Sequence, residues 1–455
     1  MNVELIPRQK SEVGTNVIFE YFDYRLSPTR KGSGMRGLAS PSIAWETGDM
    51  VDIANTAPAR RSLMNEFVAS PPRTLHRAAA LASLDPDQWR SLADRAVEPN
   101  GYYLADWELA LDATARGRTH ASALTARSDF SSGETGAETL IGLIPAISAW
   151  RAYRIPLPLL VSADPYGTLC TPLLDRDRTD QAAATLLREA RALGQRALIL
   201  RNVTLDGAAV KAFTAALEPD GLQPHRLHGH ARACLDATRD PEELLREALG
   251  AKKLKELRRQ RNRLAEHGEV SFQVARAAAE VATALETFLA LEASGWKAQR
   301  GTALIQHDGD AAFIRRAAPA LAERGQCEIV TLRAGPTPVA AAIVLRHQDR
   351  AFYFKLGVDE RFAKFSPGVQ LTLDLTRHLC ADPAITMADS TADPGHPMID
   401  PIWRGRLVIG DVLIPLRRRD PVVSLARAAI TLRKLVREPM RRAVHILRER
   451  QEKKA

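Results

Sequence analysis

The sequence has few cysteines, and their spacing excludes two classes of structure. Only four occur in 455 residues, and no two of them form a CxxC pair. They are Cys170, Cys234, Cys327 and Cys380. A disulfide frame or a structural zinc site uses closely spaced cysteines, so we expect reduced, mostly buried thiols and no redox chemistry.

Long apolar runs are also missing. A membrane-spanning helix needs about 18 or more consecutive apolar residues. The best candidates, residues 139–150 and 339–345, are too short or are interrupted by glycine and proline. The first residues, MNVELIPRQKSEVG, contain no apolar segment after a basic start, so no secretory signal is expected. We expect a cytoplasmic protein.

Acidic residues are too few to balance the basic ones, but the excess of positive charge is local. The net charge is +9, while residues 421–455 hold ten Lys/Arg against three Glu and residues 251–263 hold seven against one. The rest of the chain is therefore slightly acidic and is not a general binder of polyanions. The first basic segment is a solvated helix face or contacts an acidic ligand, RNA or lipid head groups. The second, which is amphipathic, packs on its own domain or docks on an anionic membrane face.

Length and composition predict a soluble protein of two α/β (α+β) domains with mixed sheets flanked by helices. A Gly/Ser/Pro/Arg-rich beginning indicates a flexible N-terminal extension. The predicted divisions are an extension at 1–75, domains at 76–239 and 240–420, and a basic helical tail at 421–455.

Hydrophobic periodicity predicts the individual elements. Asp85 is expected to cap the first helix, and Asp240 caps the longest, which carries the basic segment 251–263. Helices are expected from residue 85, then at 102–115, 185–193, 207–217, 241–267, 278–296, 310–324 and after 367. Strands are expected at 121–126, 138–147, 197–201, 270–276, 327–333, 339–346, 351–356 and 384–389.

The functional prediction depends on the junction at residues 365–368, with the sequence FSPG, between a strand and a helix. Proline suits the first turn of a helix, and glycine lets a ligand approach the backbone closely. The first N–H groups of the helix carry a partial positive charge and form an anion site suited to a phosphate. The residues expected there are Ser366, Gly368, Val369 and Gln370.

A cluster of histidines offers a competing site. His225, His228 and His230 precede Cys234, but the spacing in HRLHGH matches no familiar zinc frame. A polar surface turn is the other interpretation, and we assign no metal.

Three strings between residues 250 and 415 resemble the GNAT acyltransferases. They are LEASGWK (291–297) with GTAL (301–304), FSPG (365–368), and Asp389-Ser390 with HPMID (396–400) and Trp403. More closely, the chain resembles the cellulose-biosynthesis-type (CelD-like) branch. Like the Fem-type peptidoglycan aminoacyltransferases, that branch carries two GNAT-like units, the second of which binds the acyl donor. The FSPG junction departs from the Q/RxxGxG/A pattern of ordinary GNAT enzymes, because only Gly368 takes the glycine part.

The resemblance implies an acyl-CoA-dependent N- or O-acyltransferase, such as an acetyltransferase. Its acceptor would be a sugar or amine precursor used in exopolysaccharide or cell-envelope synthesis. The donor's pantetheine arm would lie along strand 339–344, at Val339 and Ala341, where that strand diverges from strand 351–356. Asp389 and then His396 rank as candidate bases, and Tyr353 could donate to the leaving thiolate. The acceptor would contact Trp296, Lys297, Glu292 and Asp400.

Each of these side chains also has a structural interpretation. The carboxylates, among them Asp359 at the mouth of the junction, are helix or turn caps, and His396 is a loop hydrogen-bonder. Tyr353 and Trp296 are then packing residues. Two further functions stay open: a Fem-like transferase that uses aminoacyl-tRNA through the basic segment 251–263, or a noncatalytic sensor or scaffold of a polysaccharide synthase at the inner membrane face.

Overall fold

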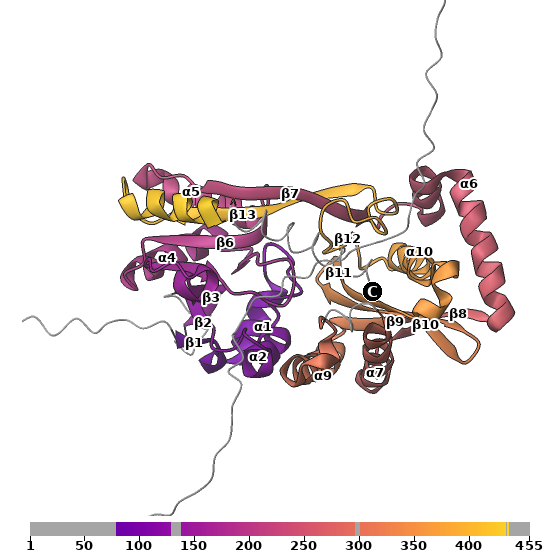
Figure 1. Ribbon diagram of the computed structural model, residues 1–455. Helices are drawn as coiled ribbons and strands as arrows, with labels where there is room; N and C mark the ends of the chain where they lie inside the picture. The colour runs from indigo at the N-terminus through magenta and orange to yellow at the C-terminus, as the bar shows by residue number, and fades with distance from the viewer. Residues whose placement is uncertain (1–78, 129–137, 296–300, 434, 436–455) are drawn as a thin grey trace, which may run out of the picture. The chain divides into compact units, whose positions relative to one another are not determined.

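The computed structural model describes residues 79–128, 138–295, 301–433 and 435. The predicted N-terminal extension, the loop at 129–137 and the side chains of Trp296 and Lys297 lie outside these residues. The described chain has a mixed α/β fold, as predicted, with one sheet of 13 strands (Figure 1). Neighbouring strands run in the order β1-β2-β3-β4-β6-β13-β7-β12-β11-β10-β9-β8, and β5 pairs with β3.

We call β1 to β7, with β13, the N-terminal half. Its first helix begins where the sequence predicts it, because the Asp85 carboxylate accepts the N–H of Asp87 at 2.9 Å and caps α1, whereas α4 begins at Thr179, six residues before the predicted start at 185. The elements are β1 Ala79–Ala80, η1 Leu81–Ser83, α1 Pro86–Asp94, α2 Ala105–Thr114, β2 Ser122–Ser128, β3 Thr139–Ser148, α3 Ala149–Tyr153, β4 Leu159–Ser162, β5 Leu173–Leu174, α4 Thr179–Ala192, β6 Ala197–Thr204, α5 Ala208–Leu217, η2 Glu218–Asp220 and β7 His225–Asp236.

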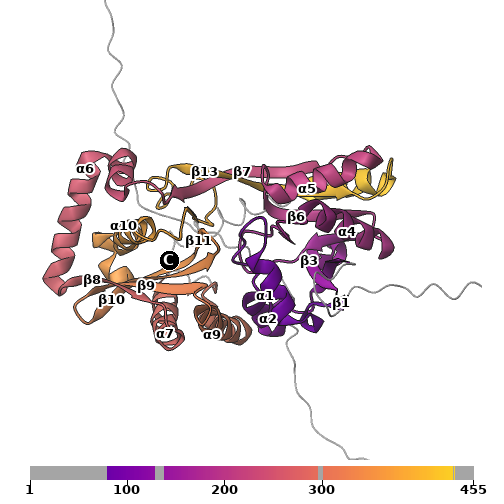
Figure 2. The ribbon, with the colours of Figure 1, turned by 180° about the vertical axis from the view of Figure 1, so that it is seen from behind.

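The C-terminal half follows the predicted order of strands and helices. Its elements are α6 Pro241–Leu264, η3 Ala265–His267, β8 Val270–Ala275, α7 Ala278–Ser294, η4 Leu304–Gln306, α9 Asp308–Ala322, β9 Cys327–Ala334, β10 Thr337–His347, β11 Arg350–Val358, η5 Glu360–Phe365, α10 Pro367–Cys380 and β12 Met387–Asp389. Helices α7 and α9 lie on one face of β9 to β11 and α10 lies on the other (Figures 1 and 2). Successive side chains of β11 point to opposite faces of the sheet. Phe352 and Phe354 therefore belong to one hydrophobic cluster and Tyr353 to another.

The prediction did not include the short elements β1, α3, β4 and β5, and three larger differences concern α6, β7 and β13. Gly250 has φ 72° and ψ 160°, so the predicted single long helix is broken there into two segments of α6. Glycine adopts such a positive φ at little cost, which is why the break falls on this residue. The histidine-rich stretch is the long strand β7 rather than a surface turn, and the structure brings no group of metal-ligating residues together within its described part.

The third difference is β13, Gly405–Pro415, which the sequence analysis did not predict. It pairs antiparallel with β6 on one edge and with β7 on the other. The chain therefore returns to the N-terminal half after completing β12. Since β7 also pairs with β12, the strands of the two halves form one continuous sheet.

Residues 421–433 form a last helix, which packs on the N-terminal half through Val423, Ala426 and Ile430. No helix in the described ranges has both the length and the apolar content to cross a bilayer.

Candidate active site

Strand β12 pairs with only part of β11, and we call the stretch of β11 beyond Phe352, which has no partner strand on that edge among the described residues, the sheet opening. These strands run parallel but are paired only from Arg350 to Phe352 of β11, whereas β11 continues to Val358. Phe354 is skipped in the register between β10 and β11, which marks a bulge just beyond the last residue paired with β12. The bulge concerns the edge of β11 that faces β10, whereas on the other edge the pairing ends because β12 itself ends at Asp389. No strand in the described part of the chain pairs with this edge of β11 beyond the bulge.

The sequence analysis placed the donor groove one strand away, between the strands that are β10 and β11. Strand β10 pairs with β9 along one edge and with β11 along the other, from Ala340 to His347. The expected groove between residues 339–344 and 351–356 is therefore absent. Val339 and Ala341 are fully buried within this paired sheet and do not offer a free edge to a donor.

The N-terminus of α10 lies against the open part of β11. A Cβ on Gly368 would meet Leu356 and Val358 of β11 at 3.0 and 3.3 Å, and Met398 at 3.4 Å. Glycine thus allows close packing of the helix on the strand, and its role in the approach of a ligand stays a prediction. The same contact places the first turn of α10 beside the sheet opening.

This first turn is electrostatically uncompensated. Ser366, the residue before the helix, has φ 53° and ψ 53°, its side chain makes no capping hydrogen bond, and no acidic residue lies in the first turn. The first bond of the helix runs from the N–H of Gln370 to the carbonyl of Ser366, at 3.0 Å. The N–H groups of Gly368 and Val369 therefore precede the helical ladder, and helix N-termini of this kind attract anions.

Gln370, predicted to bind the donor, has a different contact. Its N–H is used within α10 and its buried side chain donates to the carbonyl of Leu257, 2.8 Å away. It fixes α6 against α10. A second bond between the two helices joins Arg261 to Asp374 at 2.7 Å.

Asp389, the first-ranked base, lies at the end of β12 where the sheet opens, and it is completely buried. One carboxylate oxygen accepts from the guanidinium of Arg232, which is also buried, and the other accepts the N–H of Thr391 at 2.9 Å. Arg232 donates further to the carbonyl of Thr168 at 2.6 Å. Asp389 is thus enclosed by protein and holds the turn after β12, which is its structural interpretation.

Thr391 adds two further hydrogen bonds that hold the end of β12 in place. Its hydroxyl donates to the carbonyl of Tyr353 at 2.7 Å, and its own carbonyl accepts from the hydroxyl of Thr168 at 2.9 Å. The turn after β12 is therefore bonded to the bulged region of β11 and to the N-terminal half. The sequence analysis did not identify Arg232, Thr168 or Thr391, because their partners lie far away in the chain.

The tyrosine predicted to protonate the thiolate points into the core. The Tyr353 hydroxyl lies 3.3 Å from the Thr372 hydroxyl of α10, and its ring packs 5.9 Å from that of Trp403. Burial raises its pKa well above the usual range for tyrosine. These contacts agree with its packing interpretation.

His396 and Asp400 belong to one turn. The Nδ1 atom of His396 accepts the N–H groups of Met398 and Ile399, both at 3.2 Å, and its ring is buried. Asp400 accepts the N–H of Gly395 at 3.1 Å. Both residues thus stabilise the turn between β12 and β13.

Asp359 also acts as a cap. It accepts the N–H of Arg361 at 3.0 Å at the start of η5. Hydrogen bonds from the Arg361 guanidinium hold the pKa of this carboxyl below its ordinary value.

A buried ion pair lies on the other face of β11. Lys355 donates to Glu292 of α7 at 3.0 Å, and both side chains are almost completely buried. The second oxygen of Glu292 accepts the N–H of Leu304 at 2.9 Å, and the ammonium of Lys355 lies 5.7 Å from the ring centre of Tyr166. The prediction of a functional role for Glu292 did not include its partner Lys355. A lysine within the apolar strand sequence AFYFKLG was the available signal.

A family model matches a segment within the C-terminal half of the chain. Residues 251–393, which include β8 to β12 and the sheet opening, match the family model described as "Acetyltransferase (GNAT) domain". No curated protein matches the chain significantly.

Among solved structures the chain is similar to FemX, with 12% identity, a TM-score of 0.49, and coverage of 76% of this chain and 98% of that chain. It is also similar to the C-terminal domain of a putative lysylphosphatidylglycerol synthetase from Agrobacterium fabrum, with 14% identity, a TM-score of 0.45, and coverage of 77% and 96%. A third similar structure is a tandem GNAT protein from the clavulanic acid biosynthesis pathway, with 14% identity, a TM-score of 0.35, and coverage of 76% and 99%.

Proposed function

We propose that the chain is an acyl-CoA-dependent N- or O-acyltransferase whose donor binds at the sheet opening of β11. One observation carries the proposal: the N-terminus of α10, which has no side-chain cap and no acidic residue in its first turn, packs directly on the part of β11 beyond its pairing with β12. A helix N-terminus that could receive a phosphate thus adjoins a strand edge without a partner strand in the described chain, within the segment that matches the GNAT model.

The residues at this position suit the two ends of such a donor. The N–H groups of Gly368 and Val369 would hold the pyrophosphate, and Ser366 adds a hydroxyl beside them. The edge of β11 beyond Tyr353 would accept the amide-containing pantetheine arm, as an exposed strand edge accepts an extended peptide.

In the transfer itself, the acceptor nitrogen or oxygen would form a bond to the acyl carbon, the carbon–sulfur bond of the thioester would break, and the sulfur would take up a proton. Main-chain N–H groups that face the thioester carbonyl stabilise the oxyanion that forms in such reactions. The burial of Asp389 and Tyr353 favours roles in positioning β12 and β11 over contact with the reacting atoms.

For the acceptor we propose a sugar or amine precursor of exopolysaccharide or envelope synthesis, as the resemblance to the CelD-like branch implies. On the α7 face of β11, the buried pair of Lys355 and Glu292 supplies polar groups within the same segment. An assay of thiol release from acetyl-CoA with amino sugars as acceptors tests this class directly.

A specific observation also favours the aminoacyl-tRNA alternative. Beyond Gly250, α6 exposes a basic face whose members are Lys252, Lys253, Lys255, Arg258, Arg259 and Arg263. This segment is fixed to α10 by the bonds of Gln370 and Arg261. A polynucleotide bound along α6 would therefore lie near the proposed donor site.

The donor is tested by calorimetric titration of acetyl-CoA, and of tRNA, into the wild type, Ser366→Asp and Ser366→Asn. Both replacements tolerate the left-handed backbone at this position, so folding should be kept. The added carboxylate would repel phosphates at the first turn of α10, while the amide is its uncharged match. We expect acetyl-CoA affinity to fall at least roughly tenfold in Ser366→Asp and little in Ser366→Asn.

Failure of acetyl-CoA and longer acyl-CoAs to bind the wild type would overturn the acyl-CoA proposal. Salt-sensitive binding of tRNA that is lost when Arg258 and Arg259 become glutamate would then favour the aminoacyl-tRNA reaction. Binding of neither ligand would favour the noncatalytic function.

A further inference from the structure

Large apolar side chains are exposed mainly at one place in the described part of the chain. Five such residues are more than one-third exposed: Trp150, Ile305, Leu425, Leu432 and Leu435. All except Ile305 come from α3 or from the last helix and the residue just beyond it. These two helices pack in one apolar cluster, and Arg433 donates to the carbonyl of Tyr153 in α3 at 2.6 Å.

The last helix is apolar on two opposite faces. Val423, Ala426 and Ile430 point into the protein and are buried. Leu425, Leu432 and Leu435 recur at helical spacing on the other side and are 56%, 62% and 66% exposed. We call these three leucines the outer face. The buried residues on the inner side explain why the helix packs on the protein. They do not explain why three leucines are exposed on the outer face.

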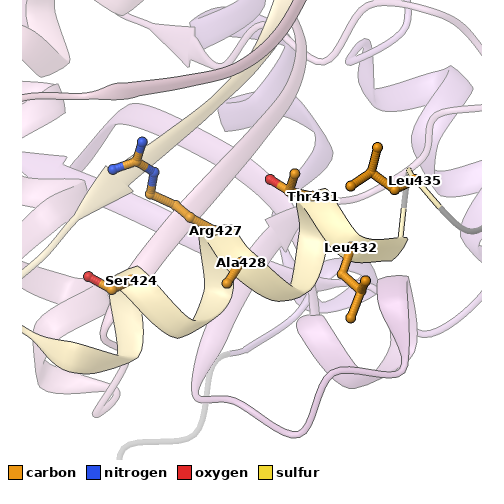
Figure 3. A pocket seen from close by; sticks show the side chains of 6 residues that line it. All are labelled: Ser424, Arg427, Ala428, Thr431, Leu432 and Leu435. Atoms are coloured by element: carbon orange, nitrogen blue, oxygen red, sulfur yellow. The ribbon is translucent and has the colours of Figure 1, made fainter.

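Figure 3 shows the open surface pocket along this helix. Its lining combines apolar side chains with two hydroxyls and a guanidinium: Ser424, Arg427, Ala428, Thr431, Leu432 and Leu435. Such a mixture of leucine, arginine and hydroxyl groups suits the boundary between lipid head groups and acyl chains.

Basic residues flank the last helix in the sequence on both sides. Arg417, Arg418 and Arg419 are exposed immediately before the helix. In sequence, the following residues 436–455 add seven Lys/Arg against three Glu. Basic segments next to an apolar helix face are attracted to anionic lipid surfaces.

We propose that the outer face docks on an anionic lipid bilayer, with the helix lying in the plane of the interface. Charge complementarity favours an anionic bilayer over two other partners of the outer face, namely a second copy of the chain and the chain's own residues 436–455. A second copy of the chain would bring a like-charged surface against this one, and the chain's own residues 436–455 carry the same sign of charge as the arginines beside the face. An anionic bilayer matches both the leucines and the charge.

Cosedimentation of the full chain with vesicles tests the proposal independently of acyl-CoA binding. The wild type, Leu425→Glu/Leu432→Glu and Ile305→Glu are mixed with vesicles of phosphatidylcholine plus phosphatidylglycerol, or of phosphatidylcholine alone. The control Ile305→Glu places one such carboxylate at an exposed apolar residue outside this region. Circular dichroism checks that each variant is folded.

We expect the wild type and Ile305→Glu to bind the anionic vesicles, more weakly as salt is raised and only slightly without phosphatidylglycerol. The double variant should bind at least roughly tenfold more weakly, because two leucines no longer enter the bilayer. No binding by the wild type, or equal binding by the double variant, would overturn the proposal. A wild-type dimer in light scattering that the double variant abolishes would assign the face to a second copy instead.

Discussion

Single residues in this protein show how burial decides the role of a polar side chain. Glu108 of α2 is completely buried, and neither carboxylate oxygen has a hydrogen-bond partner within the described chain. Burial raises its pKa well above the ordinary value, and the nearby carboxylates of Asp112 and Asp164 act in the same direction. The folded state therefore holds this proton at pH values at which the unfolded state has released it.

Replacement of Glu108 by Gln should make stability less dependent on pH. Because the pKa of Glu108 is raised in the folded state, this group contributes its full stability below the ordinary pKa of glutamate. That contribution to the free energy of unfolding is lost as pH rises from there toward the raised pKa. Glu108→Gln should thus exceed the wild type in melting temperature at alkaline pH, and the difference should shrink as pH falls. Thermal unfolding across pH, with the exposed Glu323→Gln as control, measures this effect. Parallel curves for wild type and Glu108→Gln would contradict it.

At the scale of elements, the site is held by contacts between segments that are distant in sequence. Arg232 of β7 and Asp389 of β12 form a buried pair, and Thr391 links the turn after β12 to β11. These contacts fix β12 at the point where its pairing with β11 ends. We therefore expect the pair to support both stability and the shape of the opening.

Asp389→Asn should destabilise the fold by roughly 3 kcal/mol, because it leaves the Arg232 guanidinium buried without its carboxylate. The exposed pair Arg315–Glu286, joined at 2.7 Å, provides the control, and Glu286→Gln should cost less than about 1 kcal/mol. Urea unfolding monitored by circular dichroism gives both free energies. Equal costs at the two sites would show that the buried pair has no special structural role.

Local signals predicted most elements correctly, while the arrangement of the site depended on remote contacts. The cap at Asp85 and the leucine repeats after Pro367 are readable in a short window, and α1 and α10 begin as predicted. The place where the sheet opens depends on how far β12 extends along β11, which no local pattern contains. For the same reason Asp389 was recognised in sequence, but its enclosure by Arg232 was not.

At the scale of the whole molecule, the N-terminal half is completed by the end of the chain. Strand β13 lies between β6 and β7 and pairs with both. Its run of aliphatic residues, RLVIGDVLIP, is typical of a strand, but nothing near it in sequence indicates its partners. The predicted division at residue 240 stays a prediction, and the pairing of β13 shows that the second part of the chain contributes to the first part's sheet.

A chain that ends at residue 404 should therefore fail to fold. It lacks β13, so β6 and β7 would each expose an unpaired edge, and exposed edges promote aggregation. A chain that ends after Leu435 keeps every described element and is the matched control. Solubility and a cooperative thermal transition distinguish the two, and a soluble, cooperatively unfolding product of the shorter chain would refute the expectation.

The position of β13 also has a consequence for biosynthesis. Domains generally fold as units during translation, beginning with the one synthesised first. Here the sheet of the N-terminal half is completed only when β13 leaves the ribosome, and this happens after the whole segment that matches the GNAT model has been made. The nascent protein must therefore keep β6 and β7 from pairing with other chains for most of its synthesis, and its maturation should depend on chaperones that shield strand edges.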